Sequence, residues 1–213
     1  MISNISAWYA RRAVFVAILA ASLLGGCSAM VPPPPPPDNV YLLEVKPAAT
    51  IRSALPKREL VLAVSMPRAR AGFDTAQMIW VRQEHRLEVY SRNRWADTPA
   101  RMLAPLLAQA LERSGAFHAV VQAPSGVSAT LRLDTELVRL QQDFSVHPSR
   151  VQFTLGAQLI DTATRRVIAS AEFDETENAE TEDAYGGVGA ANRALERLLA
   201  RLAAFCAEHA PPR

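Results

Sequence analysis

The sequence predicts an α+β domain in which two helices cover one face of a mainly antiparallel sheet of about seven or eight strands. Three observations support this prediction. Short segments with alternating apolar and polar residues recur along the chain, as is typical of strands with one buried face. Two segments, 98–114 and 188–208, instead carry leucines at helical spacing. The 213 residues are enough for a single domain with a substantial core.

The start of the chain has the pattern of a lipoprotein signal peptide. Arg11 and Arg12 precede an uncharged apolar run over 13–26, which is shorter than the roughly 20 residues of a bilayer-spanning helix. The run ends in Leu-Gly-Gly-Cys, which resembles the lipobox of bacterial lipoproteins. This resemblance implies that residues 1–26 are removed and that Cys27 is acylated and anchors the mature chain to a membrane. The alternative is an ordinary secretory signal with an incidental cysteine.

A linker is predicted over 27–39, ahead of a domain assigned to 40–209. Its six consecutive prolines favour a polyproline II helix, a stiff spacer of roughly 19 Å. We expect this spacer to hold the domain off the membrane surface. Ser28 stands where an aspartate favours inner-membrane retention in enteric-type sorting, so the outer membrane is predicted rather than the inner one.

Charge and cysteine content exclude further classes of protein. Removal of Arg11 and Arg12 with the signal leaves equal numbers of basic and acidic residues, which gives no indication of nucleic-acid binding. With Cys27 acylated, Cys206 is the one remaining cysteine, so no internal disulfide is expected. Its place beside an apolar helix stripe predicts a half-buried, unreactive thiol.

The first part of the domain is predicted to hold five short strands and one helix. The helix, 98–114, has Pro99 in its first turn and Gly115 as its stop, and Pro105 predicts a bend. A tight hairpin is expected at 83–86, between the third and fourth strands. The predicted strands are 41–45, 59–66, 78–82, 87–90 and 117–122.

The second part is predicted to be an antiparallel meander followed by the second helix. The alternation slips at Val138, which predicts a β-bulge, and 161–166 is the expected turn between the last two strands. The acidic segment 174–183 is interpreted as a solvated loop, with a calcium site as the alternative. The predicted meander strands are 131–140, 151–159 and 167–173.

Motifs for catalysis, cofactors or metals are not found in the sequence. The four histidines have no metal-ligand spacing, and they are His85, His118, His147 and His209. There is no nucleophile elbow, phosphate-binding glycine loop or dinucleotide fingerprint. We therefore expect no cofactor and no bound metal, and a protein that is not an enzyme.

The segment 78–99 has the most unusual composition, because tryptophan, tyrosine and arginine are concentrated in it. Tryptophan and arginine are enriched at the energetic centres of protein interfaces. The candidate partner-binding residues are Trp80, Arg82, Tyr90, Arg94 and Trp95. For Trp95 the alternative is favoured, in which its ring packs between the hairpin and the first helix.

Several segments resemble the ABC-type transport auxiliary lipoproteins, the paraquat-inducible protein C-like family. The most specific is a tyrosine followed by Arg-Trp-Ala-Asp and a proline, over 90–99. The chain departs from the family pattern at Val89, where a second aromatic residue is expected, and at Pro105. The other resembling segments are Tyr-Leu-Leu at 41–43, Leu-Val-Leu-Ala-Val at 60–64, Ile-Trp-Val-Arg at 79–82, Leu-Glu-Val-Tyr at 87–90 and Ala-Ala-Asn-Arg-Ala-Leu at 190–195.

The resemblance implies a non-catalytic accessory protein of a lipid-trafficking system with an MCE-domain protein, an ABC permease and an ATPase. Such a lipoprotein would dock the MCE-domain protein and help phospholipid or another hydrophobic substrate cross the periplasm. Because MCE proteins form rings, a homo-oligomer is a further expectation. Two alternatives stay open. One is a direct lipid carrier whose sheet and helices enclose an apolar cavity, and the other is a lipoprotein that assists assembly of outer-membrane components.

Overall fold

The computed structural model of the chain describes residues 36–45 and 58–212. The predicted signal peptide, Cys27 and most of the proline run therefore lie outside the described residues. A compact unit begins at Asp38 and contains all the elements described below. Within the described ranges, no helix combines the length and the apolar character needed to cross a bilayer.

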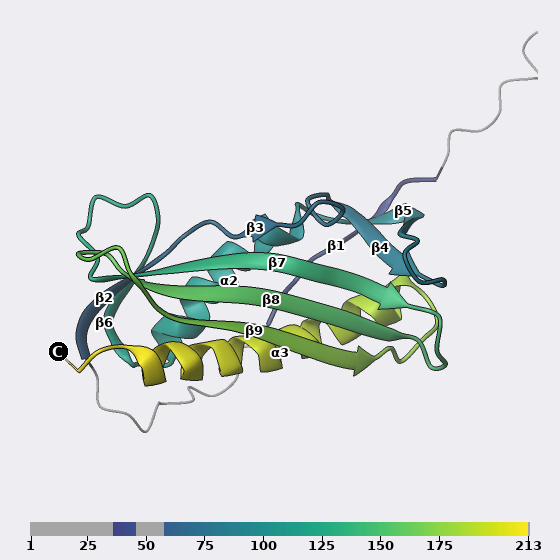
Figure 1. The fold of residues 1–213 in the computed structure, drawn as a ribbon. Helices are drawn as coiled ribbons and strands as arrows, with labels where there is room; N and C mark the ends of the chain where they lie inside the picture. Colours follow the sequence, from purple (N-terminus) through teal and green to yellow (C-terminus); the bar gives the residue numbers. More distant parts are fainter. Residues whose placement is uncertain (1–35, 46–57, 213) are drawn as a thin grey trace, which may run out of the picture. The chain divides into compact units, whose positions relative to one another are not determined.

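Two helices pack on one face of a nine-stranded sheet, which confirms the predicted α+β class (Figure 1). The strands are β1 (Asn39–Tyr41), β2 (Arg58–Val64), β3 (Arg68–Ala69), β4 (Gln77–Val81), β5 (Glu88–Trp95), β6 (Phe117–Gln122), β7 (Leu131–Asp143), β8 (Arg150–Asp161) and β9 (Val167–Asn178). The helices are α2 (Pro99–Arg113) and α3 (Ala184–His209). The additional strand is β3, a two-residue segment in what the sequence predicts to be a loop.

The long strand β7 organises the sheet. One of its edges pairs with β8, and β8 pairs with β9, in the predicted antiparallel meander. Its other edge pairs in succession with β2, β3 and β4, all of them parallel. The β7–β8 register shifts between Leu137 and Arg139, which confirms the bulge expected at Val138. The longest pairings are antiparallel, whereas the parallel pairs were not foreseen.

The helices differ from prediction mainly at the start of α3. This helix begins one turn earlier than expected, because the side chain of Asp183 caps it by accepting a 2.8 Å hydrogen bond from the Gly186 N–H. The glycines that follow Asp183 hide this start from propensity-based prediction. α2 is one helix that continues through Pro105, whose exposed ring lies on the solvent side.

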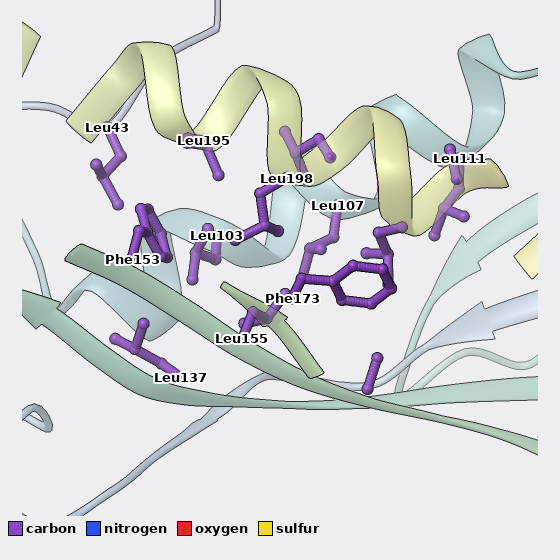
Figure 2. Close-up of a cluster of buried hydrophobic side chains, with 14 of the residues drawn as sticks. Leu43, Leu103, Leu107, Leu111, Leu137, Phe153, Leu155, Phe173, Leu195 and Leu198 are labelled. Carbon is purple, nitrogen blue, oxygen red and sulfur yellow. The ribbon is translucent and has the colours of Figure 1, made fainter. Parts of the chain in front are cut away.

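Leucine stripes from both helices meet the inner face of β7 and β8 in one core (Figure 2). Phe153 of β8 belongs to this core and has no exposed surface. The same core contains Leu103 and Leu107 from α2 and Leu195 and Leu198 from α3, all fully buried. The burial of these apolar side chains is the main source of stability.

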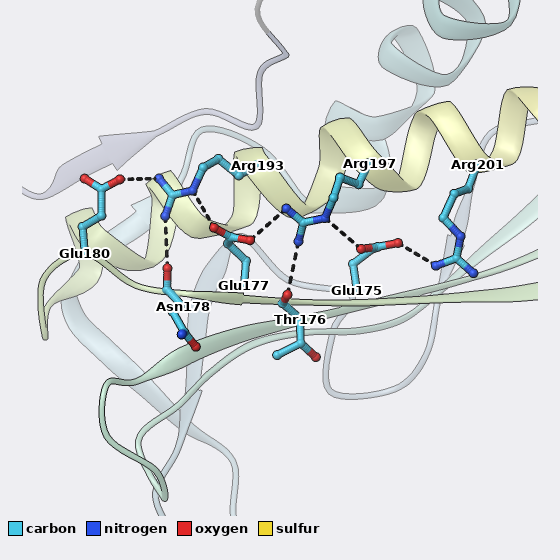
Figure 3. Close-up of polar contacts among 8 residues, drawn as sticks. All are labelled: Glu175, Thr176, Glu177, Asn178, Glu180, Arg193, Arg197 and Arg201. Atoms are coloured by element: carbon cyan, nitrogen blue, oxygen red, sulfur yellow. Dashed lines mark hydrogen bonds and ion pairs between the residues drawn. The ribbon is translucent and has the colours of Figure 1, made fainter.

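The prediction of a solvated loop over 174–183 is wrong for its first half. β9 continues to Asn178, and its acidic residues face three arginines of α3: Arg193, Arg197 and Arg201 (Figure 3). Glu175 bridges Arg197 at 3.0 Å and Arg201 at 2.6 Å. Glu177 bridges Arg193 and Arg197, each at 2.8 Å. We call these three arginines the arginine ladder.

The arginine ladder also satisfies backbone carbonyls on the free edge of β9. Arg193 donates to the carbonyl of Asn178 at 3.0 Å, and Arg197 donates to that of Thr176 at 3.2 Å. The spacing of the arginines along α3 matches the spacing of these carbonyls along β9. Four helical residues advance about 6 Å, and two strand residues advance about 6.6 Å. α3 therefore covers part of an edge that would otherwise be open to another strand.

Replacing Arg197 with alanine is expected to lower the free energy of unfolding by about 1 kcal/mol at neutral pH, a value reduced for its partial exposure. Burial raises the pKa of Glu177, but hydrogen bonds from Arg193 and Arg197 outweigh it and hold this pKa below its usual value. A depressed carboxylate pKa stabilises the fold above the unfolded-state pKa, and this contribution disappears as the pH falls through the folded-state pKa. The difference between parent and variant in denaturant titrations should therefore shrink at acidic pH. A difference that stayed constant would contradict the ionic character of the ladder.

Candidate functional site

Four of the five candidate residues reach the surface, and one does not. Arg82 and Arg94 are exposed, and Trp80 and Tyr90 are half-buried. Trp95 is only 4% exposed and belongs to the core. The backbone N–H of Trp95 donates to the Ala76 carbonyl at 2.8 Å, which fixes this residue at the end of β5. The Trp95 ring is therefore inaccessible to a partner.

Trp80 is the centre of an aromatic cluster that we call the aromatic ledge: Trp80, Tyr90 and Phe144. The rings of Trp80 and Phe144 meet edge to face with centroids 5.9 Å apart, and the Tyr90 ring lies 6.3 Å from Trp80. The guanidinium carbon of Arg82 is 5.3 Å from the centroid of the Trp80 ring, in cation–π range. The ledge therefore presents an aromatic face with a fixed positive charge.

Phe144 is the member of the ledge that sequence reasoning missed. It follows β7 directly, and β4 runs parallel to β7 with Trp80 opposite Gln142. The Phe144 N–H donates to the Val81 carbonyl at 2.7 Å, which holds the ring beside Trp80. Only this pairing of β4 with β7 brings the two rings together, and no local pattern in the sequence signals it.

A partly buried polar network supports the ledge from behind. The Tyr90 hydroxyl donates to Gln142 Oε1 at 2.9 Å, and Gln142 Nε2 donates to Ser149 Oγ at 2.9 Å. The Ser149 N–H donates to a carboxylate oxygen of Glu182 at 2.9 Å, so the network reaches the segment before α3. Burial raises the pKa of the Tyr90 hydroxyl well above its usual range, and the nearby negative charges of Asp183 and Glu182 add to the rise. Tyr90 therefore remains a neutral donor.

The ledge lies at the end of the domain where the chain enters. β1 runs parallel to β5, and Val40 lies opposite Arg94. The side chain of Arg94 forms an ion pair with Asp38 at 3.6 Å, so this candidate residue fastens the entry of the chain.

The described residues offer no assembled site for a metal or a catalytic thiol. No group of three or more histidine, cysteine, aspartate or glutamate side chains suited to metal binding is found among them. Three histidines instead lie beside single carboxylates: His85 near Glu84, His118 near Glu59 and His147 near Glu182. Cys206 is fully buried, and burial raises its thiol pKa to about 12, so it is unreactive.

The carrier alternative requires an enclosed apolar space. The apolar hollow between β4, β5, β7 and α3 has a volume of only about 10 Å³, enough for one water molecule. A larger hollow of about 400 Å³ lies over the outer face of β7, β8 and β9, but Asp134, Glu136 and Glu172 line it. Neither hollow suits an acyl chain.

The comparison with known families decides where this fold belongs. The sequence model of the ABC-type transport auxiliary lipoprotein component matches residues 41–203. The chain belongs to this family. A search of curated proteins finds no match.

Solved structures show the same fold. A Xanthomonas campestris protein of the DUF330 family superposes with a TM-score of 0.72 at 22% identity, covering 80% of this chain and 95% of that one. A hypothetical protein from Chlamydia trachomatis has a TM-score of 0.53 at 9% identity, covering 71% of this chain and 98% of that one. The family assignment makes the chain a lipoprotein component associated with ABC-type transport.

The segments that carry the resemblance to this family hold the fold together. Asn192 accepts a hydrogen bond from the Glu44 N–H at 3.1 Å and donates to the Leu42 carbonyl at 3.5 Å, which clamps the segment after β1. Its neighbour Arg193 belongs to the arginine ladder of α3, which contacts β9. Trp95 is in the core. These three residues of the pattern therefore stabilise the fold.

Proposed function

We propose that this chain is a non-catalytic docking component of an MCE-type ABC lipid transport system. In this proposal residues 1–26 are a signal peptide, and acyl chains on Cys27 hold the mature protein at the outer membrane, facing the periplasm. The domain contacts the MCE-domain protein, which works with a permease and an ATPase. Through this contact the lipoprotein supports the movement of phospholipid or another hydrophobic substrate and the integrity of the envelope.

The observation that carries the proposal is the aromatic ledge with its stacked arginine. Large aromatic rings and arginine contribute most of the binding energy in many interfaces. Here the Trp80 ring is fixed by Phe144 on one side and Tyr90 on another, so little side-chain entropy remains to be lost on binding. Arg82 lies over the Trp80 ring and has no carboxylate partner among the described residues. An acidic or polar group of the partner can therefore pair with it.

Replacing Trp80 with alanine, or Arg82 with glutamate, is expected to weaken binding of the full-length lipoprotein to the MCE-domain protein by at least about tenfold. Binding can be measured by recovery of the complex from detergent-solubilised membranes and by titration of the purified proteins. Trp95 is not a suitable test, since its replacement would damage the core.

The matched control is Arg68→Glu, which makes the same change in charge on an exposed residue of β3. This variant should bind like the parent chain. If the Trp80 and Arg82 variants both bound normally, the ledge would not be the docking surface. If the parent chain itself failed to bind, the proposed partner would be wrong.

A further inference from the structure

A second exposed surface lies at the opposite end of the long strands from the ledge. We call it the distal tip: the turn 161–166, the first residues of β9 and the loop 123–130. The turn adjoins the start of β7, where Leu131 lies opposite Asp161, whereas β4 adjoins the end of β7 (Figure 1). The 13 residues of β7 separate the two ends by about 40 Å.

Hydrogen bonds join the two loops of the distal tip into one ordered surface. The Thr162 N–H donates to the Thr130 carbonyl at 3.1 Å, and its hydroxyl donates to the Ala129 carbonyl at 2.6 Å. Within the turn, the Asp161 carboxylate accepts the Thr164 N–H at 2.8 Å. The tip therefore has a defined shape before any partner binds.

The distal tip combines two exposed arginines with exposed aliphatic side chains. Within the described part of the chain, the guanidinium groups of Arg165 and Arg166 have no ion pair or hydrogen bond. The arginine ladder shows how other arginines of this domain are paired with carboxylates. Val127 is 53% exposed, and at the start of β9 Val167 and Ile168 are 52% and 38% exposed.

The backbone of Arg165 supplies an independent indication of function. Its φ is +58°, in the left-handed region where glycine is favoured and most other residues are strained. His85, in the β4–β5 hairpin, also has a positive φ of 65°, but histidine is among the residues enriched in this region and arginine is not. An arginine placed where glycine would be more stable indicates that the side chain is needed.

We propose that the distal tip is a second docking surface, which binds an acidic and partly apolar surface of a protein partner through Arg165 and Arg166. This inference rests on the proposed docking function and adds a contact separate from the ledge. A protein partner is favoured over a lipid surface because hydrogen bonds between the two loops give the tip a fixed shape before binding, which suits a shape-complementary protein surface. The unpaired guanidinium groups provide charge complementarity, and the three aliphatic side chains provide apolar area to bury.

The test uses the full-length lipoprotein and the purified MCE-domain protein as the probe. Arg165→Gly removes the side chain and relieves the backbone, so the midpoint of thermal unfolding should rise by about 2–4 °C. The same variant should bind the MCE-domain protein at least about fivefold more weakly, and Arg166→Gln should weaken binding without the thermal gain. Arg165→Lys keeps the charge and should bind nearly as well as the parent.

The outcomes separate this inference from the proposed function. If the parent chain did not bind the MCE-domain protein, both would be contradicted. If the Trp80 variants lost binding while the Arg165 and Arg166 variants kept it, only the distal tip would be excluded. Sedimentation of the parent chain and of Arg165→Gly with phosphatidylglycerol vesicles tests whether the tip instead binds a membrane. A loss of vesicle binding on Arg165→Gly, with unchanged binding to the protein, would show a membrane contact and overturn the proposal.

Discussion

Replacing Phe153 with alanine is expected to lower the free energy of unfolding by about 3–5 kcal/mol. The ring is fully buried where the leucines of both helices meet the sheet (Figure 2). Removing it takes away apolar contact and leaves a cavity that rigid neighbours on β8 cannot fill by collapsing. Denaturant titration of the full chain would show this as a lower midpoint with an unchanged slope.

Leu42→Ala provides the control for Phe153. This side chain is also apolar, but it is 55% exposed, so its loss should change stability by less than about 0.5 kcal/mol. If both variants lost similar stability, Phe153 would not be a buried residue of the core.

Replacing Gly187 with alanine is expected to cost about 2–4 kcal/mol, because its position leaves no room for a side chain. A Cβ at this position would lie 2.1 Å from Gln142 Oε1, in the middle of the polar network behind the ledge. Gln142 cannot move aside without losing its hydrogen bonds to Tyr90 and Ser149, and both Gln142 and Ser149 are buried. The substitution should therefore lower stability and also loosen the aromatic ledge.

Gly189 gives a matched control for Gly187 in the same helix. A Cβ there would meet only Arg193 Nη1 at 3.5 Å, an ordinary contact. Gly189→Ala should therefore raise stability by about 0.5–1 kcal/mol through its higher helix propensity. Thermal unfolding of the two variants should shift in opposite directions. Equal shifts would mean that Gln142 does not occupy the space beside Gly187.

Much of the fold could be predicted because periodicity reports directly on burial. The meander, both helices and the bulge at Val138 follow from which residues face the core. The parallel pairing of β2, β3 and β4 with β7 could not be predicted in this way, since alternation identifies a strand but not its neighbour. β3 was missed because two residues are too few to show a period.

The acidic segment shows a different limit of sequence reasoning. A run of acids without a base predicts solvation, and its partners lie on α3, far along the chain. A signal was nevertheless present, since Arg193, Arg197 and Arg201 are spaced four residues apart and form one row on a helix. Reading the two charge patterns together would have indicated that α3 covers the second half of β9.

The candidate site could be predicted only in part, because its residues are brought together by strand pairing and not by their order in the sequence. Composition drew attention to Trp80 and Arg82, and the structure places them together on an exposed ledge. Composition could not separate Trp80 from the buried Trp95, because both lie in strands of one hairpin. Phe144 and the distal tip depend on strand pairing and on the backbone angle at Arg165, neither of which a residue pattern reports.

Photo-crosslinking from position 80 in intact membranes tests the central claim most directly. A photoreactive phenylalanine analogue at position 80 replaces the ledge tryptophan, and the same analogue at Gln158, exposed on the outer face of the sheet, is the control. The docking proposal predicts an adduct with the MCE-domain protein from position 80 and none from position 158. An adduct from position 158 alone, or no adduct with that protein from either position, would contradict it.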